Sequence, residues 1–301
     1  MYGAGFLAMA GAVGLSAILR KPFRGKKAGL PAIIIVLWFV CSFSSGDKNL
    51  EKTDRMLKVA GIQLEFPTDD EVVLALDKLL IAAPKTELFV LSEYTFDGPV
   101  PEKVLSRCRT HHRYLIVGGK DSAPNQNFYD TAFVIGPGGD VVFHQVKAVP
   151  IQFFKDGLPA PEQRVWDSPW GKIGLCVCYD LSYTAVVDSL IRLGAQAIIV
   201  PTMDMVTWGR REHELHARVA PVRAAEYGVP IFRIASSGIS QLVTKSGQTK
   251  VQASFPGEGE TLVGTLALAS RGSLPLDRWL APLAVVITAF AILVLAIRAW
   301  T

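Results

Sequence analysis

The chain between about Leu57 and Ser270 shows the short, alternating hydrophobic pattern of a globular domain. Short apolar runs bounded by turn-forming residues predict strands, and apolar residues three and four apart predict helices. The predicted strands lie at about 57–64, 87–91, 114–118, 128–135, 140–146, 172–177, 197–200, 231–235, 239–244, 250–254 and 261–267, and the predicted helices at about 68–83, 102–112, 183–193 and 207–227. Strands and helices mixed in this way favour a layered α/β fold with mixed sheets.

Local signals sharpen three of these elements. Thr68, followed by Asp69, Asp70 and Glu71, predicts a capped helix start. The run Gly-Pro-Gly-Gly at 136–139 predicts a hairpin between its flanking strands. Because proline cannot donate a backbone hydrogen bond, Pro221 predicts a kink or a break in the helix at 207–227.

Three longer apolar runs lie outside this domain, at 2–19, 28–45 and 279–297. A helix of about 18 apolar residues is just long enough to cross a bilayer. The alternatives are buried core helices for all three runs and a cleaved signal peptide for 20–46, where basic residues precede an apolar run. We expect three parts: N-terminal membrane helices at 1–46, a globular domain at 55–270 and a C-terminal transmembrane helix at 277–299.

The distribution of charge predicts on which side of the membrane the domain lies. Residues 20–27 (RKPFRGKK) carry five basic groups, and basic loops stay on the cytoplasmic side. The helix that begins near Ala28 then leads outward, and the last helix returns. We therefore expect a multi-pass protein of the cell's inner membrane whose domain is on the extracytoplasmic, periplasmic side.

The overall composition excludes several other classes of protein. The net charge is only +4, and no other basic run is interleaved with aromatic residues, so nucleic-acid binding is not expected. Four cysteines are too few for a disulfide framework, and the Cys-x-Cys at 176–178 lacks the second pair of a zinc site. Because His213 and His216 have no third ligand, they indicate a polar helix face. No metal and no cofactor are expected.

Three reactive side chains stand at the ends of apolar strands, where α/β proteins often place their sites. Glu93 ends LFVLSE, Lys147 ends VVFHQVK, and Cys178 ends KIGLCVC. A carboxylate can take the thiol proton and return it to a leaving group. An ammonium, helped by the backbone N–H of Tyr179, can stabilise the oxyanion that forms when a thiolate attacks a carbonyl. Together these groups predict acyl transfer through a thioester.

The motifs around these residues resemble those of the nitrilase, or carbon–nitrogen hydrolase, superfamily. GKIGLCVCYD (171–180) resembles its nucleophile motif, LFVLSEY (88–94) its glutamate motif and FHQVK (143–147) its lysine strand. Within the superfamily, MDMVTWG (203–209) and RAAEYGVPIFR (223–233) are most similar to the apolipoprotein N-acyltransferase branch. The resemblance implies an αββα sandwich, with flanking transmembrane helices in this branch. It also implies that Cys178 is the nucleophile, Glu93 the general base and Lys147 the oxyanion cation.

The chain departs from that branch in two places. The branch carries Pro-Phe-Gly-Glu shortly after the lysine, whereas this chain reads VPIQFF at 149–154, and Gln152 stands in for the second carboxylate. The N-terminal membrane part is also abbreviated, so a partner membrane subunit is a candidate. Phe153 and Trp208 are candidates for lining an acyl site, with core packing as the alternative.

Three hypotheses follow. The first is a membrane-anchored acyltransferase that moves a fatty acyl group from a phospholipid donor to an amine, such as a lipoprotein N-terminus. The second is a membrane-anchored amidase or nitrilase-type hydrolase that uses water. The third is a non-catalytic binding domain, which intact Glu93, Lys147 and Cys178 argue against.

Overall fold

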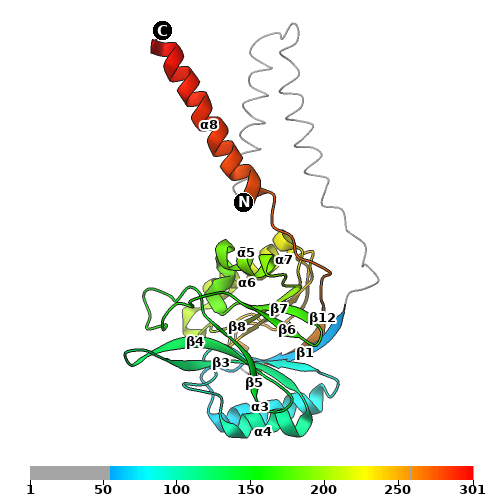
Figure 1. The fold of residues 1–301 in the computed structure, drawn as a ribbon. Helices are drawn as coiled ribbons and strands as arrows, with labels where there is room; N and C mark the ends of the chain where they lie inside the picture. The colour runs from blue at the N-terminus through cyan, green and yellow to red at the C-terminus, as the bar shows by residue number, and fades with distance from the viewer. Residues whose placement is uncertain (1–54, 258, 301) are drawn as a thin grey trace. The chain divides into compact units, whose positions relative to one another are not determined.

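The computed structural model of the protein describes residues 55–257 and 259–300 (Figure 1). The chain divides after Leu274 into a unit that contains both sheets and a second unit whose described part is helix α8 (Asp277–Trp300).

Two six-stranded mixed sheets form the centre of the first unit. The first sheet has the order β12-β1-β2-β3-β4-β5, with bounds Thr261–Ala267, Met56–Ile62, Leu88–Val90, Tyr114–Ala123, Asn127–Ile135 and Val141–Val146. The second has the order β11-β10-β9-β8-β7-β6, with bounds Thr249–Gln252, Gln241–Val243, Ile231–Ala235, Ala197–Thr202, Gly171–Leu175 and Val165–Ser168. In each sheet three neighbouring strands run parallel, β1-β2-β3 and β7-β8-β9, so the carboxyl ends of these strands lie along one edge.

Helices cover the outer face of each sheet (Figure 1). The helices are α3 (Asp69–Ala82) and α4 (Glu102–His111) on the first sheet, and α5 (Thr184–Arg192), α6 (Arg210–Ala217) and α7 (Val219–Tyr227) on the second. Apolar side chains of both sheets, such as Val59, Ile116, Ile199 and Phe232, pack together in one buried cluster. Two further clusters lie beneath the two helical layers. The predicted αββα sandwich is therefore confirmed.

The local signals in the sequence are also confirmed. The Thr68 hydroxyl accepts the backbone N–H of Glu71, and the Glu71 carboxylate accepts the backbone N–H of Thr68 at 2.7 Å, so α3 begins with a capping box. Strands β4 and β5 form an antiparallel hairpin across 136–139. The predicted helix at 207–227 breaks at Arg218, which leaves Pro221 in the first turn of α7, where its missing N–H costs little.

The membrane helices predicted from the sequence have a different outcome. The runs at 2–19 and 28–45 and the basic loop at 20–27 lie outside the described residues. Within 55–257 and 259–300, no helix is both long enough and apolar enough to span a bilayer. The predicted transmembrane helix at 277–299 coincides with α8 and is therefore not supported, and neither is the prediction that transmembrane helices flank the sandwich.

Candidate active site

The structure brings Glu93, Lys147 and Cys178 together at the carboxyl ends of their strands. Glu93 follows β2, Lys147 follows β5 directly, and Cys178 begins a short 3₁₀ helix, η2 (Cys178–Ser182), after β7. All three line one cavity of about 300 Å³. Cys178 has a φ of +51°, a conformation that non-glycine residues rarely adopt and that is concentrated at functional sites.

Lys147 is surrounded by three carboxyl groups, and all four side chains are at least 94% buried. Its Nζ lies 2.7 Å from Glu93 Oε1, 2.8 Å from Asp156 Oδ2 and 3.3 Å from Asp130 Oδ2. Burial raises the pKa of Asp130 well above its ordinary value, and the neighbouring Glu93 raises it further. Burial also acts to raise the pKa of Glu93, but Lys147 and the hydrogen bonds to Glu93 outweigh it and the pKa is lowered. The cluster therefore holds Glu93 ionised and favours a proton on Asp130.

The environment of Cys178 keeps its thiol protonated at rest. Burial raises the pKa of the thiol well above its ordinary value, and Glu93 raises it further, while Lys147 acts in the opposite direction. The Sγ donates weakly to the Met203 carbonyl at 3.5 Å, and the Met203 N–H donates to Glu93 Oε2 at 2.6 Å. A thiol of this kind becomes nucleophilic only if a base takes its proton during the attack, and Glu93 is the ionised base beside it.

The second carboxylate beside the lysine is Asp156, and the prediction that Gln152 replaces it is wrong. Gln152 is exposed and lines a different cavity, whereas Asp156 is buried against Lys147. Asp156 also accepts the Tyr94 hydroxyl and the Ile151 N–H, each at 2.7 Å. These bonds fold the loop back, so that a carboxylate nine residues after the lysine reaches its ammonium.

Asp180 ties the thiol turn to the lysine strand. Its carboxylate accepts the backbone N–H groups of Ala148 at 2.9 Å, Val149 at 2.8 Å and Val177 at 3.2 Å. Burial raises the pKa of Asp180 to about 6, although these hydrogen bonds oppose the shift. Because one side chain binds both segments, it fixes the position of Cys178 relative to Lys147.

A second, larger cavity of about 720 Å³ also reaches Cys178. It shares Ile151, Phe154 and Trp208 with the first cavity, and the rings of Phe154 and Trp208 lie 6.3 Å apart between them. The other predicted lining residues are found here too: Tyr179, Gln152 and Phe153. Phe153 is 92% exposed, so it forms a lip and is not core packing. The predicted oxyanion contact of the Tyr179 N–H remains a prediction.

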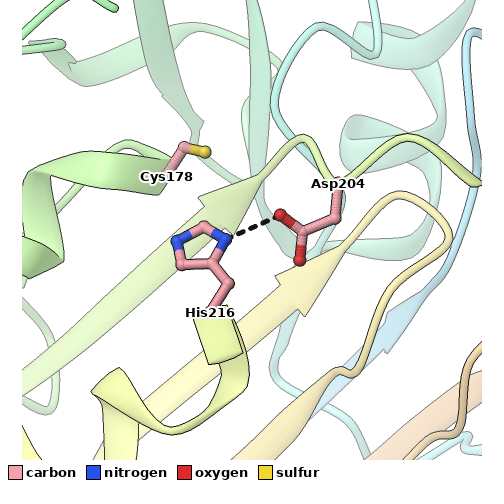
Figure 2. Close-up of side chains that lie close together, drawn as sticks. All are labelled: Cys178, Asp204 and His216. Atoms are coloured by element: carbon pink, nitrogen blue, oxygen red, sulfur yellow. Dashed lines mark hydrogen bonds and ion pairs between the residues drawn. The ribbon is translucent and has the colours of Figure 1, made fainter. Parts of the chain in front are cut away.

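A further group of polar and charged side chains, Asp204, His216 and Arg233, also lies beside Cys178. His216 Nδ1 is 2.7 Å from Asp204 Oδ1 (Figure 2). Arg233 forms an ion pair with Asp204 Oδ2. Burial acts to raise the pKa of Asp204, but Arg233 and His216 outweigh it and lower the pKa to about 2. His216 therefore has an ionised, fixed partner, and the prediction of a plain polar helix face at His213 and His216 is too simple.

Two sets of side chains in the described part of the chain approach closely enough to suggest metal ligands. They are Cys178, Asp204 and His216, and Glu93, Asp130 and Asp156. A cationic side chain of the protein already pairs with each set: Arg233 pairs with Asp204 of the first, and Lys147 pairs with Glu93 of the second. Ion pairing with these side chains satisfies the carboxylates and opposes a second positive charge.

Several site residues were missed by sequence reasoning: Asp130, Asp156, Asp204 and Arg233. A signal existed for Asp204, because it follows the buried strand β8 as Glu93 follows β2. A charged residue within a buried strand also singles out Asp130 in β4 and Arg233 in β9. Asp156 lies in an irregular loop and carries no such signal.

Comparisons with known proteins agree with this fold. Residues 72–275 match the Carbon-nitrogen hydrolase family. The chain is 26% identical over 173 residues to a deaminated glutathione amidase of Dictyostelium discoideum, covering 50% of this chain and 60% of that protein. It is 23% identical over 295 residues to an apolipoprotein N-acyltransferase of Geobacter metallireducens, and the match covers 83% of this chain and 56% of that protein. The structure of Saccharomyces cerevisiae Nit3, of the nitrilase superfamily, matches with a TM-score of 0.62 and 19% identity over 71% of this chain and 90% of that one.

Proposed function

Because the chain belongs to the carbon–nitrogen hydrolase family, we propose that this enzyme forms a thioester between Cys178 and an apolar acyl group and passes that group to an amine. Glu93 takes the thiol proton as the sulfur attacks the donor carbonyl, and returns it to the leaving group. The Lys147 ammonium, with the N–H of Tyr179, stabilises the negative charge on the carbonyl oxygen.

The observation that carries this proposal is that two cavities meet at one sulfur. A hydrolase that acts on a small amide needs space for its substrate and one water molecule. A transferase needs space for an acyl group and for a second substrate, and the cavities of about 300 and 720 Å³ offer both at Cys178. Acyl transfer is also the activity named for the Geobacter relative, whose similarity extends over 83% of this chain.

The lining of the first cavity supports a lipid-like donor. Phe66, Phe96, Phe154, Met205 and Trp208 contribute apolar surface to it. Phe153 and Phe154 add exposed aromatic surface at the edge of the second cavity, where a protein that meets a lipid surface would place it. A phospholipid ester as donor and the terminal amine of a lipoprotein as acceptor fit this chemistry.

Hydrolysis of an amide by water is the second candidate. The amidase of Dictyostelium supports it, and so does the charged floor of the first cavity, where Lys147, Glu93 and Asp156 would suit a small polar amide. The acyl-enzyme is common to both candidates, which differ in the acyl donor and in the group that accepts the acyl chain.

The test measures the products of the full-length protein. Detergent-solubilised protein is mixed with vesicles of a phospholipid labelled in its acyl chains and with a short peptide that has a free N-terminus. The proposal predicts a labelled acyl-peptide whose formation requires Cys178. Release of free fatty acid alone would favour lipid hydrolysis, and cleavage of a small amide without any lipid product would favour the amidase.

The matched control is Cys176→Ala. Cys176 is also buried, but it belongs to the cluster beneath α5 and α7 and faces away from the cavity. Cys176→Ala should keep the acyl-peptide product that Cys178→Ala loses.

A further inference from the structure

Among the side chains that line the second cavity, Glu212 and His216 are a possible acid and base that the steps above do not use. Both lie on α6, four residues apart, so they share one face of the helix. Cys178 lines the same cavity, and its Sγ, a His216 ring nitrogen and an Asp204 oxygen all lie within 4.8 Å of one another. The face of α6 formed by Glu212 and His216 therefore looks onto the atom that would carry the acyl group.

The orientation of His216 leaves one ring nitrogen free to accept a proton. Asp204 is ionised and held by Arg233, and its Oδ1 is bonded to His216 Nδ1 at 2.7 Å. Nδ1 also lies 3.2 Å from an Arg233 nitrogen, but its shorter contact is with the ionised carboxylate, which favours the hydrogen on Nδ1 and leaves Nε2 as an acceptor. Figure 2 shows the second ring nitrogen on the side of the ring that faces away from Asp204.

Glu212 brings a carboxyl group with one unpaired oxygen to the same cavity, where burial, and then Asp204, raise its pKa. Its Oε2 is buried and accepts no hydrogen bond from any described residue. A buried carboxylate oxygen without a partner is costly, and a positively charged donor from a substrate would remove that cost. An ammonium is the smallest substrate group that supplies both the charge and several N–H donors.

We infer that the face of α6 formed by Glu212 and His216 is the acceptor site for a protonated amine, in which Glu212 binds the ammonium and His216 takes one of its protons. The inference rests on the proposed thioester at Cys178. Asp204 acts as a positioning residue, because it touches His216 and not the substrate.

The proton balance explains why a second base is needed. The ammonium gives one proton to His216 Nε2 and becomes a neutral amine, which attacks the thioester carbonyl. As the C–N bond forms and the C–S bond breaks, the amine loses a second proton to Glu93, which passes it to the departing Cys178 sulfur. The protonated His216 then releases its proton to solvent through the open cavity. Water as acceptor has only one proton to lose during the attack, so Glu93 suffices.

The experiment measures how the acyl-enzyme divides between amine and water. Full-length protein is acylated with a short-chain thioester, and the ratio of amide to free acid is recorded with glycine amide, which is protonated at neutral pH, and with methoxyamine, which is not. The variants are His216→Gln, Glu212→Gln and, as a matched control, Glu214→Gln. Glu214 lies on the same helix but is exposed and outside the cavity. Because both products come from the same acylated protein, their ratio does not depend on how much of a variant is folded.

His216→Gln is expected to lower the glycine amide ratio about 100-fold, the usual contribution of a positioned base, with a much smaller change for methoxyamine. Glu212→Gln should raise the glycine amide concentration needed for half of the full effect about 10-fold, since a charge-assisted contact is lost. Ratios in both variants equal to that of Glu214→Gln would overturn the inference. If only water, and no amine, cleaved the thioester of the wild-type protein, the inference of an acceptor site would be overturned, but the proposed acyl-enzyme would stand. If no adduct formed on Cys178, the proposed function itself would be overturned.

Discussion

Two buried groups of charged side chains lie near Cys178, and they differ in how many carboxyl groups each cation faces. On the lysine side, Lys147 of the first sheet faces three carboxyl groups, and the pKa of Asp130 is raised in consequence. On the histidine side, Arg233 of the second sheet and His216 share one carboxylate, and the pKa of Asp204 falls to about 2. Three carboxyl groups around one ammonium favour a site that exchanges protons, whereas a single carboxylate paired with a guanidinium stays ionised and orients its neighbour His216.

The largest effect is expected when the base on the lysine side is removed. Glu93→Gln keeps the size of the side chain and one oxygen that can accept from Lys147 or from Met203, but it cannot take the thiol proton. Acylation of Cys178 by a thioester donor should slow by about 10²–10⁴-fold in a single turnover followed by mass spectrometry. The control is Glu87→Gln, because Glu87 directly precedes β2 but does not line the cavity. A rate within a few-fold of wild type would remove Glu93 from the proposed mechanism.

The next largest effect concerns stability. Lys147→Met leaves three buried carboxyl groups without their cation, and breaking a buried ion pair in this way costs about 3–5 kcal/mol. Lys172→Met removes an exposed partner of Asp167 and should cost about 1 kcal/mol or less. Urea unfolding of the three proteins measures both. Equal losses would show that the lysine cluster contributes no more than a surface pair.

A smaller effect, with a definite sign, is expected from Asp130→Asn. A folded-state pKa above the ordinary value of 3.8 means that the native state prefers the neutral form. The stability contributed by that preference is complete below the ordinary pKa and is lost as the pH rises toward the folded pKa. Asparagine stays neutral, so the variant should gain stability relative to wild type between about pH 4 and pH 7.

The measurement is the free energy of unfolding in urea across that pH range. Asp121→Asn, which changes a half-buried aspartate of β3 outside the lysine cluster, is the control. A relative gain for Asp130→Asn that shrinks as the pH rises would contradict the raised pKa of Asp130.

The smallest effect probes the aromatic wall between the two cavities. Each buried methylene of a substrate contributes about 0.8 kcal/mol, so kcat/KM should rise about fourfold per added methylene until the cavity is filled. Trp208→Ala should flatten this dependence, while Val206→Ala, an exposed neighbour in η3 (Val206–Trp208) that lines neither cavity, should not. A slope unchanged by Trp208→Ala would place the acyl chain elsewhere.

The sequence predicted the lysine side better than the histidine side, for a physical reason. Parallel strands bring their carboxyl ends to one edge, so strand ends made Glu93, Lys147 and Cys178 candidates, and the resemblance of the motifs around them supplied their roles. The groups around His216 come from β9 and from the loop after β8. The periodicity of a helix does not predict contacts with residues so far away in the sequence. The position of Asp156 could not be predicted, because it lies in an irregular loop whose path is set by the hydrogen bonds of Asp156 itself.

The central claim is that Cys178 carries the acyl group during turnover. Full-length protein in detergent is mixed with a phospholipid donor, quenched with acid at short times and analysed as intact mass and as peptides. The account predicts an added acyl mass on the Cys178 peptide that forms before any product and disappears when an amine is added. Turnover at the wild-type rate with no such adduct, or with the adduct retained in Cys178→Ala, would contradict it.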